Sequence, residues 1–276
     1  MIKKAADANN VFDFNKISKE MLHPYAYHYL MEGADDLKII QINQDIFQEL
    51  QIRTRRLIDV SNVDTSLRLF GQKLKSPIIL CPTARNKMFH PQAEFAIARA
   101  AYKKKYQMIL STESSFALDD IAKEYKDPLW FQFYPQNNEQ QNKRIIDMAE
   151  KSNCSLIMLT VDAATGGSRE RPKNYNKTIL KKGWNDRGTL IKTQVNGDSG
   201  LLTETLTWDK TLRWLKKATS KKIVLKGIVT KEDAQLALNY GVDGIMVSNH
   251  GGRSLESLRS SLECLPEIVK VINKKI

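Results

Sequence analysis

From residue 77 onward, short apolar runs alternate with longer stretches in which apolar and polar residues are mixed. Continuous runs rich in isoleucine, leucine and valine are typical of parallel strands that are buried on both faces of a sheet. Six such strands are predicted, at Pro77–Cys81, Met108–Ser111, Leu129–Tyr134, Leu156–Asp162, Ile223–Gly227 and Ile245–Val247. A long polar segment, residues 163–205, separates the fourth strand from the next helix.

The stretches between the strands have apolar residues three and four positions apart, which predicts amphipathic helices. Helices are expected at Pro91–Lys104, Leu118–Tyr125, Glu139–Lys151 and Trp208–Ala218, and in the segment after Thr230. Thr230 and Asp233 have the spacing of a helix amino-terminal cap. The last helix is expected to carry apolar residues from Leu255 to Ile272 and to be interrupted at Pro266.

Residues 1–75 precede the alternating region and have a different pattern. They are predicted to form helices and a hairpin, with helices at Ile17–Met31 and Asp36–Leu50 and short strands at Leu57–Val60 and Leu67–Phe70. The chain is therefore expected to be one domain, residues 1–276, in which residues 76–276 carry the strand–helix units.

Polar side chains lie at or near the carboxyl ends of the predicted strands. They are Ser111, Gln132, Tyr134, Thr160, Asp162, Lys226, Ser248 and His250. Active sites of (β/α)8 barrels form at that end of the strands, so the pattern favours an α/β fold of the TIM-barrel type. Each residue alone also fits a helix cap or a polar layer inside a barrel. A lysine in an apolar strand is costly to bury without a partner, which makes Lys226 the hardest to explain as a purely structural residue.

The segment Gly244–Arg253 combines the sixth strand with the strongest candidate chemistry. Its apolar residues end at Ser248-Asn249-His250, and two glycines then allow a sharp turn before Arg253. His250 can exchange a proton near neutral pH, and the planar guanidinium of Arg253 can bind a carboxylate. The alternative is an ordinary loop with a hydrogen-bonded histidine and a solvated arginine.

Composition and charge argue against several other classes of protein. The 276 residues contain no apolar run long enough to span a bilayer, and the first residues lack the apolar core of a secretory signal. The three cysteines are far apart, which argues against a disulfide framework or a zinc site, and no metal is expected. The net charge of +12 comes from scattered lysines without interleaved aromatic residues, so nucleic-acid binding is not expected.

Several short motifs occur in a fixed order along the chain. They are Tyr29 ahead of Gly33-Ala34, Pro82-Thr83-Ala84 with His90-Pro91, Trp130–Tyr134, Leu159–Asp162 and Ser248–Arg253. In this order and spacing they resemble the FMN-dependent α-hydroxy-acid oxidase/dehydrogenase family, which includes glycolate oxidase, lactate oxidase and the flavin domain of flavocytochrome b2. The resemblance covers nearly the whole chain. It implies a TIM (β/α)8-type barrel, FMN as the cofactor, and oxidation of a small (S)-2-hydroxy acid similar to lactate or glycolate.

The resemblance also implies roles for the polar residues around the substrate. His250 is the base that takes a proton from the α-carbon or from the hydroxyl of the substrate, and Asp162 orients it and stabilises its charged form. Tyr134 forms a hydrogen bond with the substrate hydroxyl. The side chains expected to bind the substrate carboxylate are Arg169, Arg253 and Tyr29.

Such an oxidation also requires an electron acceptor, which none of these side chains supplies. The resemblance implies FMN, with Lys226 beside the flavin edge that becomes negative on reduction. The other residues expected to hold the isoalloxazine and ribityl parts are Thr83, Ala84, Ser111, Gln132, Thr160 and Ser248. Arg85 departs from the family pattern, because an uncharged residue is expected beside the flavin at that position.

Family members continue beyond the point that corresponds to Ile276, with segments that bind the FMN phosphate and complete the barrel. The sequence is therefore expected to hold about six βα units of an incomplete barrel. Two interpretations stay open: a fragment of an FMN-dependent oxidase or dehydrogenase, or a truncated, catalytically inactive relative that acts only as an interaction partner. Oxygen or another electron acceptor, assembly into a homo-oligomer, and a cytoplasmic or peroxisomal location are further expectations.

Overall fold

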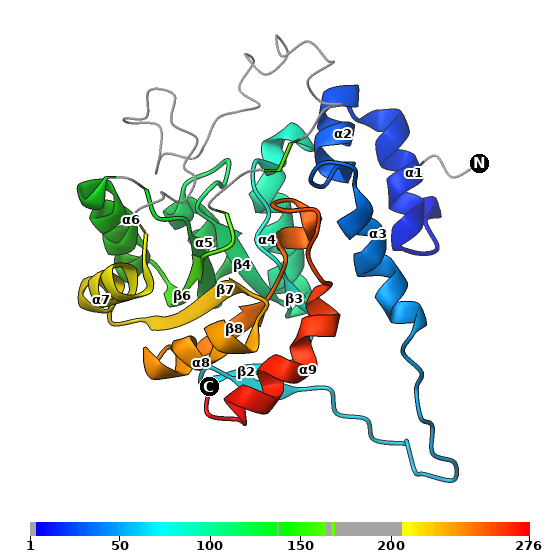
Figure 1. Ribbon diagram of the computed structural model, residues 1–276. Coiled ribbons are helices and arrows are strands. Elements are labelled where there is room, and N and C mark those ends of the chain that lie inside the picture. The colour runs from blue at the N-terminus through cyan, green and yellow to red at the C-terminus, as the bar shows by residue number, and fades with distance from the viewer. Residues whose placement is uncertain (1–3, 137, 164–166, 169–205) are drawn as a thin grey trace.

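The computed structural model describes residues 4–136, 138–163, 167–168 and 206–276. Six parallel strands form one curled sheet in the order β3-β4-β5-β6-β7-β8, which is also their order along the chain. Their bounds are β3 Ile79–Leu80, β4 Gln107–Ser111, β5 Leu129–Phe133, β6 Cys154–Thr160, β7 Lys222–Ile228 and β8 Gly244–Val247. With helices covering one face of this sheet (Figure 1), the fold is an incomplete TIM-type barrel, as the sequence predicted.

The helices that follow the strands along the chain cover this face of the sheet. They are α4 Ala93–Lys104, α5 Leu118–Tyr125, α6 Glu139–Lys151, α7 Trp208–Ala218, α8 Lys231–Asn239 and α9 Ser261–Ile272. The predicted bounds of α5, α6 and α7 are confirmed at both ends. The last four of these helices are capped by the residues that precede them, Asn138, Thr207, Thr230 and Ser260, whose side chains each accept a hydrogen bond from the backbone N–H three residues later. No helix in the described part of the chain is long and apolar enough to cross a membrane.

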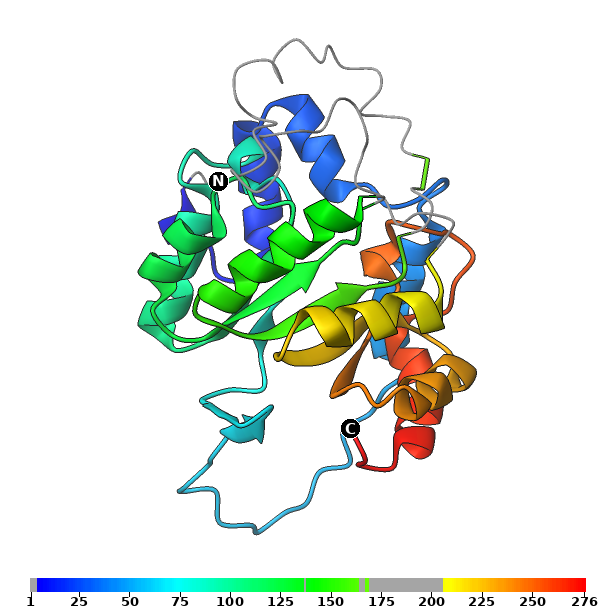
Figure 2. The same ribbon diagram turned by 90° about the vertical axis from the view of Figure 1, so that its left-hand side faces the viewer.

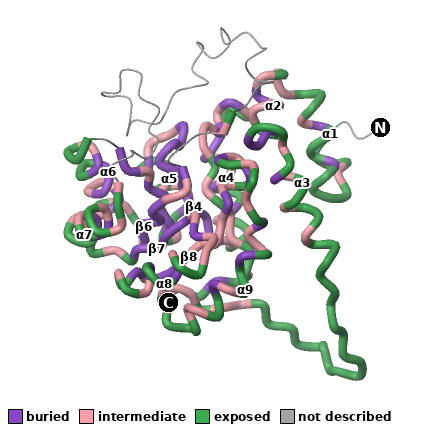
Figure 3. The backbone as a smooth tube through the Cα atoms, in the orientation of Figure 1, coloured by how far each residue is buried: buried purple, intermediate pink, exposed green. Residues whose placement is uncertain are grey.

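Residues alternate between the two faces of each strand, and the two faces have different surroundings. The outer face packs against the helices in the main hydrophobic core, with buried side chains such as Phe131, Leu159 and Leu225. The inner face carries a smaller apolar cluster that includes Trp130 and Met158. Figure 3 shows that the central strands are largely buried, whereas much of the surface of the surrounding helices is exposed. Polar residues that continue the inner-face series therefore point into the half-barrel.

A hairpin of β1 (Leu67–Leu69) and β2 (Gln72–Leu74) fills the amino-terminal end of the half-barrel. Phe70 in its turn packs edge-on against Trp130, with the ring centroids 5.4 Å apart. The Trp130 indole N–H also donates a hydrogen bond to Oε1 of Gln72 at 2.7 Å. Side chains thus occupy this end, and the polar groups gather at the carboxyl end of the strands.

Two helices replace the single helix predicted at Ile17–Met31. They are α1 (Val11–Met21) and α2 (Pro24–Met31), and α3 (Lys38–Asp45) follows them. Pro24 occupies the first turn of α2, where its missing N–H is not needed, but a proline cannot continue the preceding helix. The chain therefore turns before Pro24 and places α2 and α3 as separate elements.

The strand predicted at Leu57–Val60 is wrong. Residues 49–66 run as an extended trace away from the sheet (Figures 1 and 2), and the Leu57 and Val60 side chains are exposed. Between them Asp59 Oδ1 accepts a hydrogen bond from the Ser61 N–H at 2.9 Å, which favours a local turn. A strand needs a pairing partner, and no described strand pairs with this segment.

The interruption predicted at Pro266 is also wrong, because α9 runs continuously from Ser261 to Ile272. Proline lacks the N–H that would bond one turn back, which lowers helix stability. Cys264 and Ile268 are nevertheless buried in the main core on either side of it, and this packing holds the helix. Leu255, predicted to belong to the same helix, precedes its first residue.

Tyr125 connects α5 to β4, and its hydroxyl should be important for stability. The hydroxyl donates a hydrogen bond to the Tyr106 carbonyl at 2.8 Å and accepts one from the Met108 N–H at 3.2 Å. Because Tyr125 is 2% exposed, Tyr125→Phe leaves two backbone groups without this partner while keeping the packed ring. We expect the free energy of unfolding in urea to fall by about 1–3 kcal/mol. Tyr102→Phe on α4 is the matched control, and equal losses in both variants would contradict the prediction.

Candidate active site

A row of hydrogen-bonded polar side chains crosses the inner face at the carboxyl ends of β4, β5 and β6. Ser111 Oγ donates to Gln132 Oε1 at 2.9 Å, and Gln132 Nε2 donates to Thr160 Oγ1 at 2.8 Å. All three residues are at most 3% exposed. Each end of the Gln132 amide is therefore held by a neighbouring strand, which makes the row rigid.

Lys226, Asp162 and His250 form a largely buried cluster next to this row. Asp162 Oδ1 lies 2.7 Å from His250 Nδ1, and Lys226 Nζ lies 3.1 Å from the same ring nitrogen. The Lys226 ammonium is also 3.5 Å from Asp162 Oδ2, and the two side chains are 9% and 12% exposed. Opposite charges therefore offset one another in a region that water hardly reaches.

The other ring nitrogen of His250 faces Tyr134. The Tyr134 hydroxyl oxygen lies 3.0 Å from His250 Nε2, and the two rings are stacked with centroids 6.2 Å apart. A carboxylate can only accept hydrogen bonds, and the Asp162 contact of Nδ1 is shorter than the Lys226 contact, so Asp162 favours the imidazole tautomer that carries its proton on Nδ1. The Lys226 ammonium then interacts mainly with the Asp162 carboxylate. His250 Nε2 then accepts the hydrogen bond of Tyr134. A chain of hydrogen bonds thus leads from the Asp162 carboxylate to the Tyr134 phenol.

Burial sets the ionisation of Lys226 and Tyr134. Desolvation lowers the pKa of Lys226 below its ordinary value, although the nearby Asp162 carboxylate opposes this shift. Desolvation raises the pKa of Tyr134 above its ordinary value, and the charges of Asp162 and Glu113 raise it further while Arg253 opposes them. Tyr134 therefore remains protonated at neutral pH and can donate a hydrogen bond.

The loop that carries His250 has a strained backbone. His250, Gly251 and Gly252 have φ angles of 60°, 63° and 73°, in the left-handed region that favours glycine. Only the histidine has a side chain there, and such a conformation persists when the surroundings enforce it. Ser248, which was predicted to contact the cofactor, contributes by accepting a hydrogen bond from the His250 N–H at 3.0 Å.

Asn249 holds this loop against the rest of the protein. Its buried amide exchanges two hydrogen bonds with the amide of Asn43 on α3, at 2.7 and 3.2 Å. It also donates to the Arg259 carbonyl at 3.1 Å and accepts from the Gly252 N–H at 3.2 Å, while its own N–H donates to Ser261 Oγ at 3.1 Å. The sequence analysis included Asn249 in a motif without a role, and the structure shows that it fixes the loop.

Gly227 makes room for Asp162 and was missed by the sequence analysis. It has a φ of +113°, and a Cβ at this position would lie 2.5 Å from both Cβ and Cγ of Asp162. Any side chain there would therefore push Asp162 away from His250. The available signal was the glycine itself, because a glycine directly after Lys226 in an apolar strand indicates a close approach of another group.

Arg253 lies at the carboxyl end of α2. Its guanidinium donates hydrogen bonds to the carbonyls of Glu32 at 2.6 Å and Tyr29 at 2.9 Å, and its Cζ atom lies 4.9 Å from the centre of the Tyr29 ring. A cation at this end of a helix is favourable for the helix dipole. The structure thus brings together Arg253 and Tyr29, whereas Arg169, predicted to bind the same carboxylate, lies outside the described residues.

Thr83 and Ala84 lie in the loop after β3, at one edge of the described sheet. The Thr83 hydroxyl donates to Asn86 Oδ1 at 3.0 Å, and the Asn86 amide donates to the Thr83 carbonyl at 2.9 Å. Glu94, which is buried, accepts from the Asn86 amide at 2.9 Å and from the Ser115 N–H at 3.0 Å. The sequence analysis missed Glu94, because nothing local marks an acidic residue in the first turn of a helix as buried.

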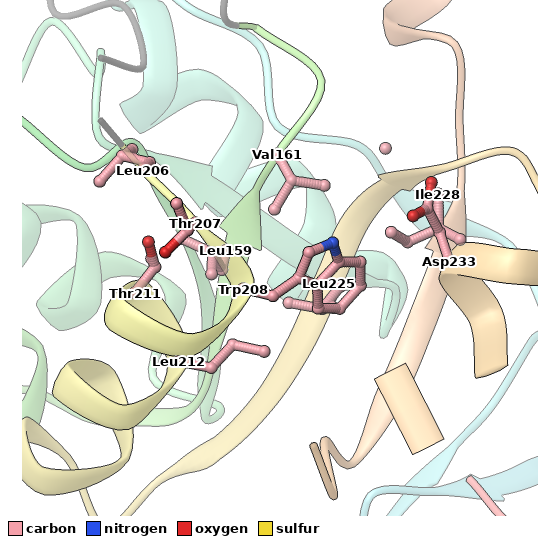
Figure 4. Close-up of a pocket in the computed structure, with 11 residues that line it drawn as sticks. Leu159, Val161, Leu206, Thr207, Trp208, Thr211, Leu212, Leu225, Ile228 and Asp233 are labelled. Atoms are coloured by element: carbon pink, nitrogen blue, oxygen red, sulfur yellow. The ribbon is translucent and has the colours of Figure 1, made fainter. Parts of the chain in front are cut away.

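A cavity of about 250 Å³ lies between α7 and the outer face of β6 and β7 (Figure 4). Its lining includes Leu159, Leu225 and Trp208. Leu159 and Leu225 alternate with Thr160 and Lys226 along their strands, so the sheet separates this cavity from the polar cluster. Apart from Gly227, which borders both, the cavity is therefore separate from the site described above.

Comparisons with known proteins identify the family. Residues 18–276 match the family model described as FMN-dependent dehydrogenase. The chain is 34% identical to glycolate oxidase 3 of Arabidopsis thaliana, over 98% of this chain and 76% of that protein. It is also 34% identical to L-lactate oxidase of Nostoc sp., over 96% of this chain and 77% of that protein.

Solved structures agree with this result. The crystal structure of mandelate oxidase is similar with a TM-score of 0.85 and 28% sequence identity, over 95% of this chain and 75% of that one. A mutant of mandelate oxidase with an FMN adduct gives a TM-score of 0.79 and 27% identity, over 95% and 75% of the two chains.

Fold, site and comparisons together define an oxidoreductase that uses FMN as its cofactor. The chain belongs to the FMN-dependent dehydrogenase family. The resemblance inferred from the sequence motifs is thereby confirmed, whereas the roles of individual side chains stay predictions.

Lys226 should make the stability of the protein depend on pH in the alkaline range. Its pKa is lower in the folded protein than its ordinary value, so between these two values the unfolded chain binds more protons than the folded protein. The contribution of this group to the free energy of unfolding therefore rises with pH across that window. Lys226→Met should remove this rise, as measured by urea denaturation from about pH 7 to about pH 10.5.

Lys222→Met provides the control for this experiment. Lys222 lies at the exposed start of the same strand, so its replacement should leave the slope of unfolding free energy against pH unchanged. An identical slope in the wild type and in Lys226→Met would show that the Lys226 ammonium is not destabilised by burial.

Proposed function

We propose that the protein oxidises a small (S)-2-hydroxy acid, similar to lactate or glycolate, to the 2-oxo acid with FMN as the electron acceptor. The observation that carries this proposal is the chain of hydrogen bonds Asp162–His250–Tyr134, with contacts of 2.7 and 3.0 Å. It combines a base, a carboxylate that stabilises the charged form of the base, and a hydrogen-bond donor. The names of the relatives, glycolate oxidase and L-lactate oxidase, support the substrate class.

His250 acts as the base in this proposal. Its Nδ1–H donates to Asp162 at 2.7 Å, so Nε2 is the atom that takes a proton from the α-carbon or from the hydroxyl of the substrate. The resulting imidazolium is stabilised by the Asp162 carboxylate. A positioned base of this kind contributes about 10²- to 10⁴-fold to the rate.

Tyr134 donates a hydrogen bond to the substrate hydroxyl. Its own hydroxyl contacts His250 Nε2 at 3.0 Å, so a substrate hydroxyl bound next to both residues can interact with the base and with the donor. Burial raises the pKa of Tyr134, which keeps the phenol protonated while the base works. At the same pH, Tyr134 can therefore donate a hydrogen bond while His250 accepts a proton.

Arg253, Arg169 and Tyr29 bind the substrate carboxylate. The hydrogen bonds of Arg253 to the end of α2 orient its guanidinium. Arginine has five N–H donors in a planar fork, so one side chain can hold a helix end and bind a carboxylate. The two arginines and the tyrosine together would place the substrate with its α-carbon near His250.

The buried polar row on the inner face fits FMN. Its hydroxyl and amide groups suit the hydrogen-bonding edge of a flavin, and the desolvated ammonium of Lys226 favours a negative neighbour. The residues that would hold the cofactor are Thr83, Ala84, Ser111, Gln132, Thr160, Lys226 and Ser248. When bound, FMN supplies the acceptor for the two electrons that leave the substrate.

Oxygen or another acceptor would regenerate the oxidised cofactor, and the relatives that are named oxidases favour oxygen. A homo-oligomer is also part of the proposal. It is supported by the exposed apolar side chains of the segment 49–66, among them Ile52, Leu57 and Val63.

A second candidate function is that of a catalytically inactive interaction partner. The same exposed side chains favour it. The buried charges of Asp162 and Lys226 favour catalysis instead, because a partner protein gains nothing from burying them.

An absorbance spectrum of the purified chain with and without added FMN distinguishes the two functions. We expect the peaks of bound flavin, and we expect them to bleach when L-lactate or glycolate is added in the absence of oxygen. Bound flavin that neither acid bleaches would support the inactive partner. A protein that binds no FMN would fit a fragment of the enzyme as well as an inactive relative.

His250→Ala should leave the flavin bound and slow its anaerobic reduction by L-lactate or glycolate by about 10²- to 10⁴-fold, as measured by stopped-flow absorbance. The reason is that Asp162 and Tyr134 remain in place but no base takes the proton. His90→Ala is the matched control, because His90 is exposed and accepts a hydrogen bond from the Gln92 N–H. Reduction of His250→Ala at nearly the wild-type rate would refute the role of His250.

A further inference from the structure

Arg85 and Glu113 form an ion pair in the loops that follow β3 and β4. Arg85 Nη2 lies 3.5 Å from Glu113 Oε2, and the two side chains are 28% and 9% exposed. The Arg85 N–H also donates a hydrogen bond to the Glu113 carbonyl at 3.0 Å. A carboxylate that is buried to this extent destabilises a protein unless it is paired, so the pair acts as one unit.

The position of this pair is fixed by Glu94. The Glu94 carboxylate accepts hydrogen bonds from the N–H groups of Asn86 at 3.3 Å and Ser115 at 3.0 Å. Asn86 directly follows Arg85, and Ser115 lies two residues after Glu113. One buried carboxylate thus ties the two loops together and holds the ion pair rigidly between them.

The loop that carries Glu113 is hydrogen-bonded to Tyr134. Thr112, the residue before Glu113, accepts a hydrogen bond from the Tyr134 N–H at 3.2 Å. The charge of Glu113 raises the pKa of Tyr134 and the charge of Arg253 lowers it, so the phenol lies within electrostatic range of both. Glu113 follows β4 and Arg253 follows β8, and three strands separate these two in the sheet. Tyr134 therefore has a negative group on one side and a positive group on the other.

We propose that the Arg85–Glu113 pair forms the pocket for the side chain of the substrate and selects 2-hydroxy acids whose side chain carries a hydrogen-bond donor, such as a hydroxymethyl group. This inference rests on the proposed function. If its carboxylate lies at Arg253 and its hydroxyl at Tyr134, such a substrate would direct its side chain toward Glu113, because β4 and β8 lie on opposite sides of β5 in the sheet.

Charge and hydrogen bonding explain this selectivity. The Arg85 guanidinium offsets the Glu113 charge, so the pocket does not repel an anionic substrate. A carboxylate accepts several hydrogen bonds, and a bond from a substrate hydroxyl to Glu113 is strengthened by the charge. An apolar side chain would instead remove water from Glu113 without replacing its hydrogen bonds, which weakens binding.

Isothermal titration calorimetry with pyruvate and hydroxypyruvate, in the presence of excess FMN, tests the inference. The two 2-oxo acids differ by one hydroxyl group and have no α-hydrogen to lose. We expect hydroxypyruvate to bind at least about tenfold more tightly than pyruvate, so the ratio of the dissociation constant of pyruvate to that of hydroxypyruvate should be about ten or more. Glu113→Leu should reduce this ratio to about one. A wild-type ratio near one, an unchanged ratio in Glu113→Leu, or no binding of either acid would overturn the inference.

Further variants separate the pocket from a general effect on folding. Glu113→Gln keeps the size of the side chain and should lower the ratio by about threefold or more, because the hydrogen bond loses its charge. Arg85→Met should weaken both acids to a similar extent, because Glu113 then repels both anions. Glu139→Leu, on the exposed first turn of α6, is the matched control and should leave the ratio unchanged. An unchanged ratio in Glu113→Gln would contradict the pocket even if Glu113→Leu fails to fold.

Anaerobic flavin reduction distinguishes failure of the pocket from failure of the proposed oxidation. Reduction by L-lactate together with a binding ratio that does not depend on Glu113 would overturn the pocket and leave the oxidation intact. A ratio that depends on Glu113 without reduction by lactate, glycolate or glycerate would overturn the oxidation and support the pocket.

Discussion

The buried contact of Asp162 with Lys226 and His250 is the interaction on which the rest of the site depends. A carboxylate and an ammonium with so little exposure are tolerated because each offsets the charge of the other. The parallel pairing of β6 with β7 brings them together, since Thr160 and Lys226 are direct partners in the register. Gly227 then leaves the space that Asp162 occupies. The two neighbouring strands β6 and β7 thus place the charged groups of the site, and the loops add the other side chains around them.

Much of the fold could be predicted because its elements are specified locally. Apolar periodicity predicts helices such as Leu118–Tyr125 and Trp208–Ala218, and Thr207 also caps the second of them. Continuous apolar runs predict the strands. The errors have non-local causes. Leu57–Val60 has the composition of a strand but no described strand to pair with, and Pro266 is kept inside a helix by packing on the core. Both outcomes depend on what surrounds a segment, which its own residues do not reveal.

The same distinction applies to the site. Parallel strands deliver their carboxyl ends to one edge of a sheet, so the convergence of Gln132 with residues from adjacent strands could be predicted from strand order alone. Gly227, Asn249 and Glu94 act through close approaches and hydrogen bonds between segments far apart in sequence, and their residue types are unremarkable. The sequence showed Arg85 as a departure from the family pattern, but only the structure shows that it pairs with Glu113.

The two hydrogen bonds between Asn43 and Asn249 have a consequence for the order in which the protein assembles. They join residues 206 positions apart, and contacts of such long range form late because a large loop must close first. The sheet from β3 to β8 can form from successive neighbours, whereas the left-handed conformation of His250 is enforced once α3 has docked. A folding intermediate with a complete sheet would therefore still lack a correctly placed imidazole.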